Sequence, residues 1–218
     1  MKFVHTADWQ LGKPFARISD PHKRSLVQQA RIDAIGRIGR AAAEGGAECI
    51  LVAGDLFDST SVDKATVAAT CSAIGQIDLP VIVIPGNHDH GGPGSVWEQA
   101  FFLREQAALA PKLTLLRDAA PFEMDAAVIL PCPLLRRAVV TDPTDWLRAD
   151  ALYAALPADK PRIVLAHGSI QTFLGKSHDD EAASPAATLI DLARLPTAEI
   201  DYIALGDWHG MKRIGERT

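Results

Sequence analysis

Side chains that can bind a metal ion or move a proton stand together directly after an apolar run in the stretch VIVIPGNHDH, residues 81–90. Four β-branched residues in a row indicate a strand buried on both faces, and a Pro-Gly pair ends it. The side chains that follow are Asn87, His88, Asp89 and His90. A Gly-Asn turn is the alternative for this stretch taken alone, although it would explain the Asn and the Asp better than two His.

The same arrangement occurs at four other places in the chain, each a short apolar run with polar groups just past its carboxyl end. The runs at 3–7, 49–53, 163–166 and 202–205 end at Asp8, at Gly54-Asp55, at His167-Gly168 and at Gly206-Asp207-Trp208-His209. In open α/β sheets, ligands bind at the carboxyl ends of the strands. We therefore expect the five polar ends to meet at one site.

The segments between the first three runs predict helices. Asp20 followed by Pro21 is typical of a helix start, an apolar pattern of helical period follows, and Gly45-Gly46 marks its end. A second helix is expected at about 62–75. Strands and helices that alternate through short links predict a parallel sheet with helices on its faces.

The pattern of the second half is less regular. The short runs LTLL and AVIL between residues 111 and 133 predict antiparallel strands of a second sheet. Further helices are expected near 96–106, near 145–156 with Thr144 as N-cap, and at 188–195, while 162–166 returns to the parallel pattern. The fold class is therefore α/β, and we expect residues 1–218 to form a single domain.

The overall composition is that of an ordinary globular protein, with 48% hydrophobic and 22% charged residues. The amino terminus lacks the apolar core of a signal peptide, and no apolar run approaches the roughly 20 residues of a membrane helix. Cys49, Cys71 and Cys132 lie in apolar surroundings without zinc-binding spacing, so we expect core thiols in a reducing cytoplasm. The net charge of −5 argues against a broad basic face for nucleic acid, although it does not exclude a metal-dependent nuclease.

The chemistry of the five ends is that of a site for hard or borderline divalent metals such as Mn²⁺. Carboxylates, a few imidazoles and amides are the groups that such ions prefer. Two metals need a shared anionic ligand, and Asp55, on a central strand, suits a bridging position. A pair of metals about 3.5–4 Å apart clamps a phosphoryl group and makes a nucleophile of a bound water.

The ordered motifs carry a resemblance to a known family. The series Asp8-x-Gln10, Gly54-Asp55-x-x-Asp58, Gly86-Asn87-His88-Asp89, His167-Gly168 and Gly206-Asp207-x-His209 resembles the calcineurin-like metallophosphoesterases. The opening HTADWQLGKP is similar to that of the SbcD-type DNA repair nucleases. The resemblance extends from Met1 to His209, and it implies a four-layer α/β/β/α sandwich of two mixed sheets with two Mn²⁺ ions that hydrolyse phosphodiester bonds.

The resemblance also implies roles for individual residues. The metal ligands would be Asp8, Gln10, Asp55, Asn87, His167, Asp207 and His209, with Asp55 bridging. His88 would contact the phosphate and protonate the leaving oxygen, while Asp58 and Asp89 would orient their neighbours.

Two positions depart from the pattern of the family. Gln10 stands where the family usually has His, and Asp207 stands where it has another His. The amide of Gln10 is a weak neutral donor, so the first metal would be held more loosely. The carboxylate of Asp207 would favour Mn²⁺ or Mg²⁺ over Zn²⁺. The alternative is a decayed site in a non-catalytic scaffold.

Three residues near the ends are candidates for substrate contacts: Lys13, Arg17 and His90. For a nuclease that acts on DNA ends or single strands, the bases would guide the phosphate backbone. The alternative substrate is a small nucleotide, which the fold also supports. Nucleases of this type continue further with a segment that docks onto a coiled-coil ATPase, and no such segment is visible here. We therefore expect a domain truncated at its C-terminal end, and an ATPase partner for the full-length protein.

Overall fold

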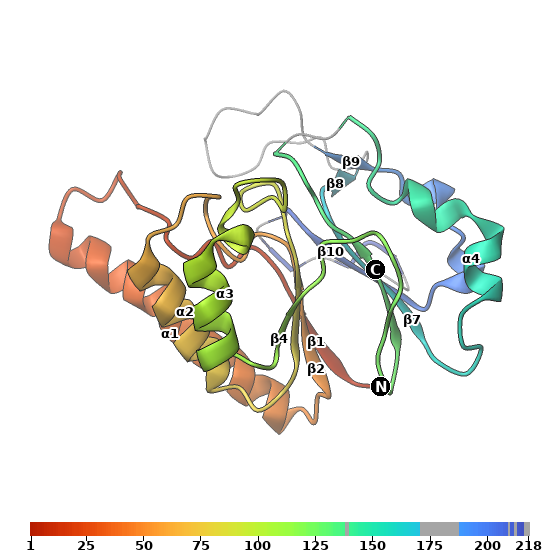
Figure 1. Ribbon diagram of the computed structural model, residues 1–218, viewed down its shortest axis with the longest axis horizontal. Coiled ribbons are helices and arrows are strands. Elements are labelled where there is room, and N and C mark those ends of the chain that lie inside the picture. Colours follow the sequence, from red (N-terminus) through yellow and green to blue (C-terminus); the bar gives the residue numbers. More distant parts are fainter. Residues whose placement is uncertain (138–139, 171–187, 209, 212, 216–218) are drawn as a thin grey trace.

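The computed structural model describes residues 1–137, 140–170, 188–208, 210–211 and 213–215. Two sheets lie face to face between helices (Figure 1): α1, α2 and α3 cover the outer face of one sheet, and α4 lies beside the other. The four-layer α/β/β/α arrangement that the resemblance implies is therefore confirmed. No described helix combines the length and the apolar character needed to cross a membrane.

The first sheet was expected to be mixed, but its described strands are all parallel, in the order β1-β2-β3-β4. Its strands are β1 (Phe3–Thr6), β2 (Cys49–Ala53), β3 (Val81–Ile84) and β4 (Leu113–Leu115). Each crossover steps to the next strand in the same direction. Because such crossovers are right-handed, all their helices fall on one face of the sheet. The other face is left free to pack on the second sheet.

The helices of the outer face begin where the sequence provides a cap. In α1 (Pro21–Glu44), the Asp20 carboxylate accepts hydrogen bonds from the backbone N–H groups of His22 and Lys23. In α2 (Lys64–Gly75), the Asp63 carboxylate does the same for Thr66. The 3₁₀ turn η1 (Val96–Glu98) then leads into α3 (Ala100–Leu109). The expected helices of the first half are thus confirmed within a few residues.

The second sheet is mixed, with strand order β10-β7-β6-β5. Strands β10 (Tyr202–Gly206), β7 (Arg162–His167) and β6 (Val128–Cys132) are parallel, and β5 (Phe122–Glu123) pairs antiparallel with β6. The short elements that accompany it are η2 (Asp145–Arg148), α4 (Asp150–Ala154), β8 (Ser169–Ile170), β9 (Leu189–Ile190), η4 (Leu192–Arg194) and η5 (Thr197–Glu199).

Alternate residues of the central strands enter different cores. Ile50 and Val52 of β2 pack under the helices, whereas Leu51 and Ala53 pack against the second sheet. Burial on both faces accounts for the near-continuous apolar sequence of these strands. The cysteines at 49, 71 and 132 are buried and unpaired, as expected.

Three expectations for the second half are wrong. The run at 113–115 joins the first sheet, parallel to β3, and not the second sheet. The single helix expected near 145–156 is divided at Ala149, which has an extended conformation, into η2 and α4. The segment 188–195, expected to be a helix, forms β9 and η4, because Leu189 and Ile190 pair with β8.

Candidate metal centre

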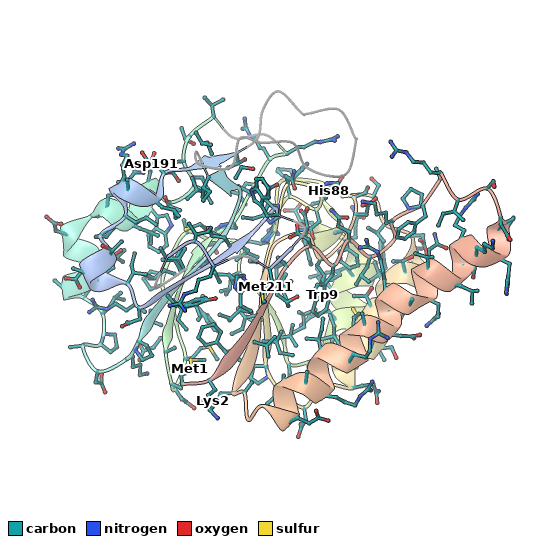
Figure 2. All side chains as sticks on the ribbon, turned by 180° about the vertical axis from the view of Figure 1, so that it is seen from behind. Met1, Lys2, Trp9, His88, Asp191 and Met211 are labelled. Atoms are coloured by element: carbon teal, nitrogen blue, oxygen red, sulfur yellow. The ribbon has the colours of Figure 1, made fainter. Side chains whose placement is uncertain are left out.

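The carboxyl ends of strands from both sheets meet at one edge of the molecule. Figure 2 shows His88, just past β3, at this edge, while Met1 and Lys2 at the start of β1 lie at the opposite edge. Backbone hydrogen bonds join the ends: the N–H of Asp8 donates to the Gly54 carbonyl at 3.1 Å, and that of Gln10 to the Asp55 carbonyl at 2.9 Å. The expected convergence is thus observed for the described part of the chain.

The backbone turns sharply at the polar residues of this edge. Among the described residues, a positive φ occurs outside glycine at only five positions, and four of them were predicted as metal ligands. These are Asp8 (56°), Gln10 (43°), Asp55 (54°) and Asp207 (99°), the fifth being Phe15. Such conformations are strained for residues with a Cβ and persist where surrounding contacts impose them. They aim the four side chains into the space between the strand ends.

The ring of His167 is surrounded by oxygen atoms. Its Nδ1 lies 2.8 Å from the Ala53 carbonyl oxygen, and its Nε2 lies 3.1 Å from Asn87 Oδ1. The carboxylate oxygens nearest to Nε2 are Asp55 Oδ2 at 3.6 Å and Asp207 Oδ1 at 3.8 Å. Because a carbonyl only accepts, Nδ1 carries a proton, which leaves Nε2 directed at a group of acceptors that only a cation can satisfy together.

The protonation of His167 reflects this environment. Burial alone would lower its pKa, but the negative charges of Asp55, Asp8 and Asp207, with the hydrogen bond to Ala53, raise the pKa to about 9. In the metal-free protein, a proton on Nε2 therefore supplies the positive charge that the oxygens require. A divalent metal would take the place of this proton.

The residues present fit a divalent metal. Asp8, Asp55 and His167 each offer a ligand atom, and these atoms all lie within 4.8 Å of one another. The donor set is rich in carboxylates, with an amide oxygen from Asn87 and a single described imidazole nitrogen. Such a set suits Mn²⁺ or Mg²⁺.

His88 is placed beside this cluster and remains accessible. Its Nδ1 donates to the Asp58 carbonyl oxygen at 2.9 Å, and the Asp58 carboxylate lies 3.8 Å away. Its Nε2 lies 4.0 Å from Asp55 Oδ2, and its backbone N–H donates to Asp55 Oδ1 at 2.9 Å. With 30% of its side chain exposed, His88 can meet both the metal cluster and a bound substrate.

Asp89 is fully buried and joins two strand ends. One carboxylate oxygen accepts from the N–H of Gly86 at 2.8 Å, and the other accepts from the N–H of Phe57 at 3.0 Å. Burial and the negative charge of Asp55 raise the pKa of Asp89 to about 7. Since Asp89 touches backbone on both sides, its position agrees with an orienting role.

The side chain of Gln10 faces the ammonium group of Lys13. Its side chain is buried, and its amide oxygen accepts a hydrogen bond from Lys13 Nζ at 2.9 Å. The same ammonium lies 3.9 Å from Asp58 Oδ1. The structure therefore places Gln10 at the site, but with its oxygen engaged by Lys13.

The remaining predicted residues differ in their placement. Arg17 is exposed on the loop that follows β1, and His90 is half-buried, with no hydrogen bond to Nδ1 among the described atoms. His209 lies outside the described residues.

One contributor was missed by the sequence reasoning. The hydroxyl of Ser169 donates a hydrogen bond to the Asp207 carboxylate and helps to hold it beside His167. Its place directly after the His167-Gly168 pair could have marked Ser169 as a residue of the site, but not which group it contacts.

The comparisons with known proteins agree with this geometry. Residues 1–211 match the calcineurin-like phosphoesterase family, and the chain belongs to it. The solved structure of TT1561 of Thermus thermophilus is 16% identical, with a TM-score of 0.50 over 84% of this chain and 72% of that one. A second solved chain is 12% identical, with a TM-score of 0.50 over 85% of this chain and 83% of that one. At these identities the likeness concerns the fold alone.

Membership of the family defines the class of activity. The protein is a metal-dependent hydrolase of phosphoester bonds, with Asp8, Asp55 and His167 as a candidate metal site.

Proposed function

We propose that this protein is an Mn²⁺-dependent nuclease that hydrolyses phosphodiester bonds of DNA, as the SbcD-type repair nucleases do. The observation that carries the proposal is the buried His167 Nε2, which faces acceptor oxygens from Asn87, Asp55 and Asp207. The opening HTADWQLGKP supports a DNA substrate, and the exposed Arg17 stands on the loop that follows this opening. Phosphate contacts of this kind supply most of the affinity for DNA that is independent of sequence.

The chain's own residues would act on the leaving group and on the metal. When bound, the metal lowers the pKa of a water ligand and so provides the nucleophile. His88 Nδ1 lies on the Asp58 carbonyl oxygen, which leaves Nε2 as the nitrogen that would donate a proton to the leaving oxygen. A water that has released one proton to solvent would form the new bond to phosphorus as the bond to the leaving oxygen breaks, and that oxygen would receive a proton from His88.

The second candidate is a phosphodiesterase that acts on a small nucleotide. The net charge of −5 favours it, because a long polyanion is repelled by an acidic protein. The two candidates share the metal centre and differ in the surface around it.

One assay distinguishes these activities. Supercoiled plasmid, single-stranded DNA and bis-p-nitrophenyl phosphate are incubated with Mn²⁺, Mg²⁺ or Zn²⁺. We expect Mn²⁺-dependent cleavage of DNA, and a loss of about 10²–10⁴-fold in His88→Ala, the usual contribution of a general acid. His22→Ala, at the exposed start of α1, is the matched control. Hydrolysis of the small ester without DNA cleavage would favour the second candidate, and no turnover with any metal would leave a scaffold.

Two further parts of the proposal concern the setting of the enzyme. A coiled-coil ATPase is proposed as partner, to be tested by co-purification with a tagged form of this chain. The three unpaired thiols support a reducing compartment such as the cytoplasm.

A further inference from the structure

The site contains two positions at which oxygen atoms gather around a side-chain nitrogen. At the first, His167 Nε2 lies 3.1 Å from Asn87 Oδ1, 3.6 Å from Asp55 Oδ2 and 3.8 Å from Asp207 Oδ1. At the second, the ammonium of Lys13 lies 2.9 Å from the amide oxygen of Gln10 and 3.9 Å from Asp58 Oδ1. The positive charge at the second position is covalently attached to the chain and cannot diffuse away.

The loop that carries Lys13 is anchored on several sides. Gly12 has a φ of +87°, which reverses the chain just before Lys13, and the Lys13 N–H donates to the Gln10 carbonyl at 3.3 Å. The Lys13 carbonyl accepts from the side chain of Gln28 on α1 at 3.2 Å. The Leu11 carbonyl accepts a hydrogen bond from the N–H of Asp58 at 3.0 Å, and this bond joins the loop to the one after β2. These bonds hold the backbone from which the ammonium reaches Gln10.

The surroundings of Lys13 disfavour a second divalent cation. The Gln10 oxygen already accepts a charge-assisted hydrogen bond, and only 23% of the Lys13 side chain is exposed. A metal that used the Gln10 oxygen would have to displace the ammonium and then tolerate its repulsion in a partly buried place. The amide oxygen is also a weaker ligand than the imidazole that the family usually has at this position.

We propose that Lys13 is a resident cation of the site, which takes the place of one of the two metals, so that this protein binds one divalent ion tightly. The tight site is the one around Asp55, Asn87 and His167. The inference rests on the proposed function only in assuming that a divalent ion is bound. It adds that the ammonium would face the phosphate oxygen that a second metal would otherwise neutralise.

The test is the number of Mn²⁺ ions bound to the full chain, measured by native mass spectrometry and by calorimetric titration without substrate. We expect one ion per wild-type chain, with any second ion bound at least tenfold more weakly. In Lys13→Met, the affinity for a second Mn²⁺ ion should rise at least tenfold. The rise should be clearer when Gln10→His is combined with Lys13→Met. The spectrum of two coupled Mn²⁺ ions should then appear in electron paramagnetic resonance. Lys23→Met, on the exposed start of α1, should leave the count at one.

The outcomes separate this inference from the proposed function. Two ions of similar affinity in the wild-type chain would overturn the role of Lys13 and leave the proposed activity intact. No bound ion would overturn both. Lys13→Gln serves as a second variant, because it removes the charge and keeps a polar group, and circular dichroism verifies that each variant is folded. A double variant that is folded and still binds a single ion would also overturn the inference.

Discussion

At the scale of single residues, the site is built on backbone conformations that side chains seldom adopt. Asp8, Gln10, Asp55 and Asp207 all have positive φ, and glycine stands at none of these positions. A sequence selected for stability alone would place glycine at several of them. The carboxylates at three of these positions indicate that the fold is less stable than it could be, and that in return charged oxygens point toward a cation.

Asp207 offers a direct measure of this strain. With its φ of 99°, we expect Asp207→Gly to be more stable than Asp207→Ala by about 1 kcal/mol in EDTA, because glycine is free of the Cβ conflict. Both variants should bind Mn²⁺ less tightly than the wild type, because both lose the oxygen near His167. Thermal unfolding in EDTA and calorimetric titration give the two quantities. Equal stability of the two variants would show that the backbone at this position is not strained.

The pH dependence of the metal-free protein should follow His167. Its pKa of about 9 in the folded chain exceeds the ordinary value of 6.5, so its protonation stabilises the fold fully below pH 6.5. That contribution is lost as the pH rises through about 9. In EDTA, the midpoint of thermal unfolding should therefore fall between pH 7 and 9, and the increase produced by Mn²⁺ should grow over the same interval.

The control for this prediction is His167→Asn, which keeps a polar side chain but cannot titrate. Its unfolding midpoint in EDTA should change less between pH 7 and 9. The interval avoids the thiols, because burial raises the pKa of Cys49 and of Cys71 to about 11. Asp89, with a pKa of about 7, is present in both proteins, so the difference between them isolates His167. A wild-type midpoint that rises with pH in EDTA would contradict the assignment.

The sequence predicted which residues gather at the site better than it predicted their contacts. Spacing after the strands was enough to place Asp8, Asp55 and His167 together. The pairing of Gln10 with Lys13 could not be read from spacing, because it depends on a φ of 43° at Gln10 and a reversal at Gly12. The same applies to the Ser169 hydroxyl, whose partner is far along the chain.

At the scale of elements, one buried carboxylate holds two strand ends in register. Asp89 accepts from Gly86 after β3 and from Phe57 after β2, while its own carbonyl accepts from the indole of Trp97. The approach is close enough that a Cβ on Gly86 would lie 2.1 Å from Asp55 Oδ1. The position of Asp55 is thus set by neighbouring loops as well as by its own strand.

Asp89→Asn tests this connection. The amide can accept at one atom only, so one backbone N–H would face another donor, which costs about 1–3 kcal/mol. We expect a lower unfolding midpoint and weaker Mn²⁺ binding, because Asp55 and His88 lose their support. Asp118→Asn, at an exposed position, is the matched control. Unchanged stability together with lost activity would instead assign Asp89 a direct part in the chemistry.

The elements that the sequence predicted well are those whose burial is uniform. Strands β2 and β3 are apolar throughout because both faces are covered, and α1 and α2 carry clear caps. The errors fall on short elements. Three residues at 113–115 cannot reveal which sheet they join, and residues 189–190 form a strand only because β8 lies beside them.

At the scale of the whole molecule, the site lies where the two sheets come together. Gly206 at the end of β10 is so close to β2 that a Cβ would lie 1.9 Å from the Ala53 carbonyl oxygen. The cluster therefore takes ligands from both sheets, Asp8 and Asp55 from the first and His167 from the second. Neither sheet alone could form it, which explains why five separated motifs are needed to recognise the site.

The charge of the whole molecule predicts how DNA cleavage should respond to salt. The chain carries a net charge of −5, so attraction to a polyanion must come from a few bases near the site, such as Lys13 and Arg17. Each phosphate contact on a duplex contributes a slope of about −0.9 in the logarithm of affinity against that of salt. Two contacts therefore lower the affinity for DNA about tenfold between 50 and 200 mM salt.

We therefore expect kcat/KM on duplex DNA to fall about tenfold over this range, while hydrolysis of bis-p-nitrophenyl phosphate changes little. Arg17→Ala should reduce the salt slope on DNA by about half, because it removes one of the two phosphate contacts. It should leave the small ester unaffected, because Arg17 is not among the residues of the metal cluster. A fall of 10³-fold or more would require many more contacts than this acidic surface offers. It would mean that the site around Asp55 serves a larger basic surface, and that the few bases named here do not account for DNA binding.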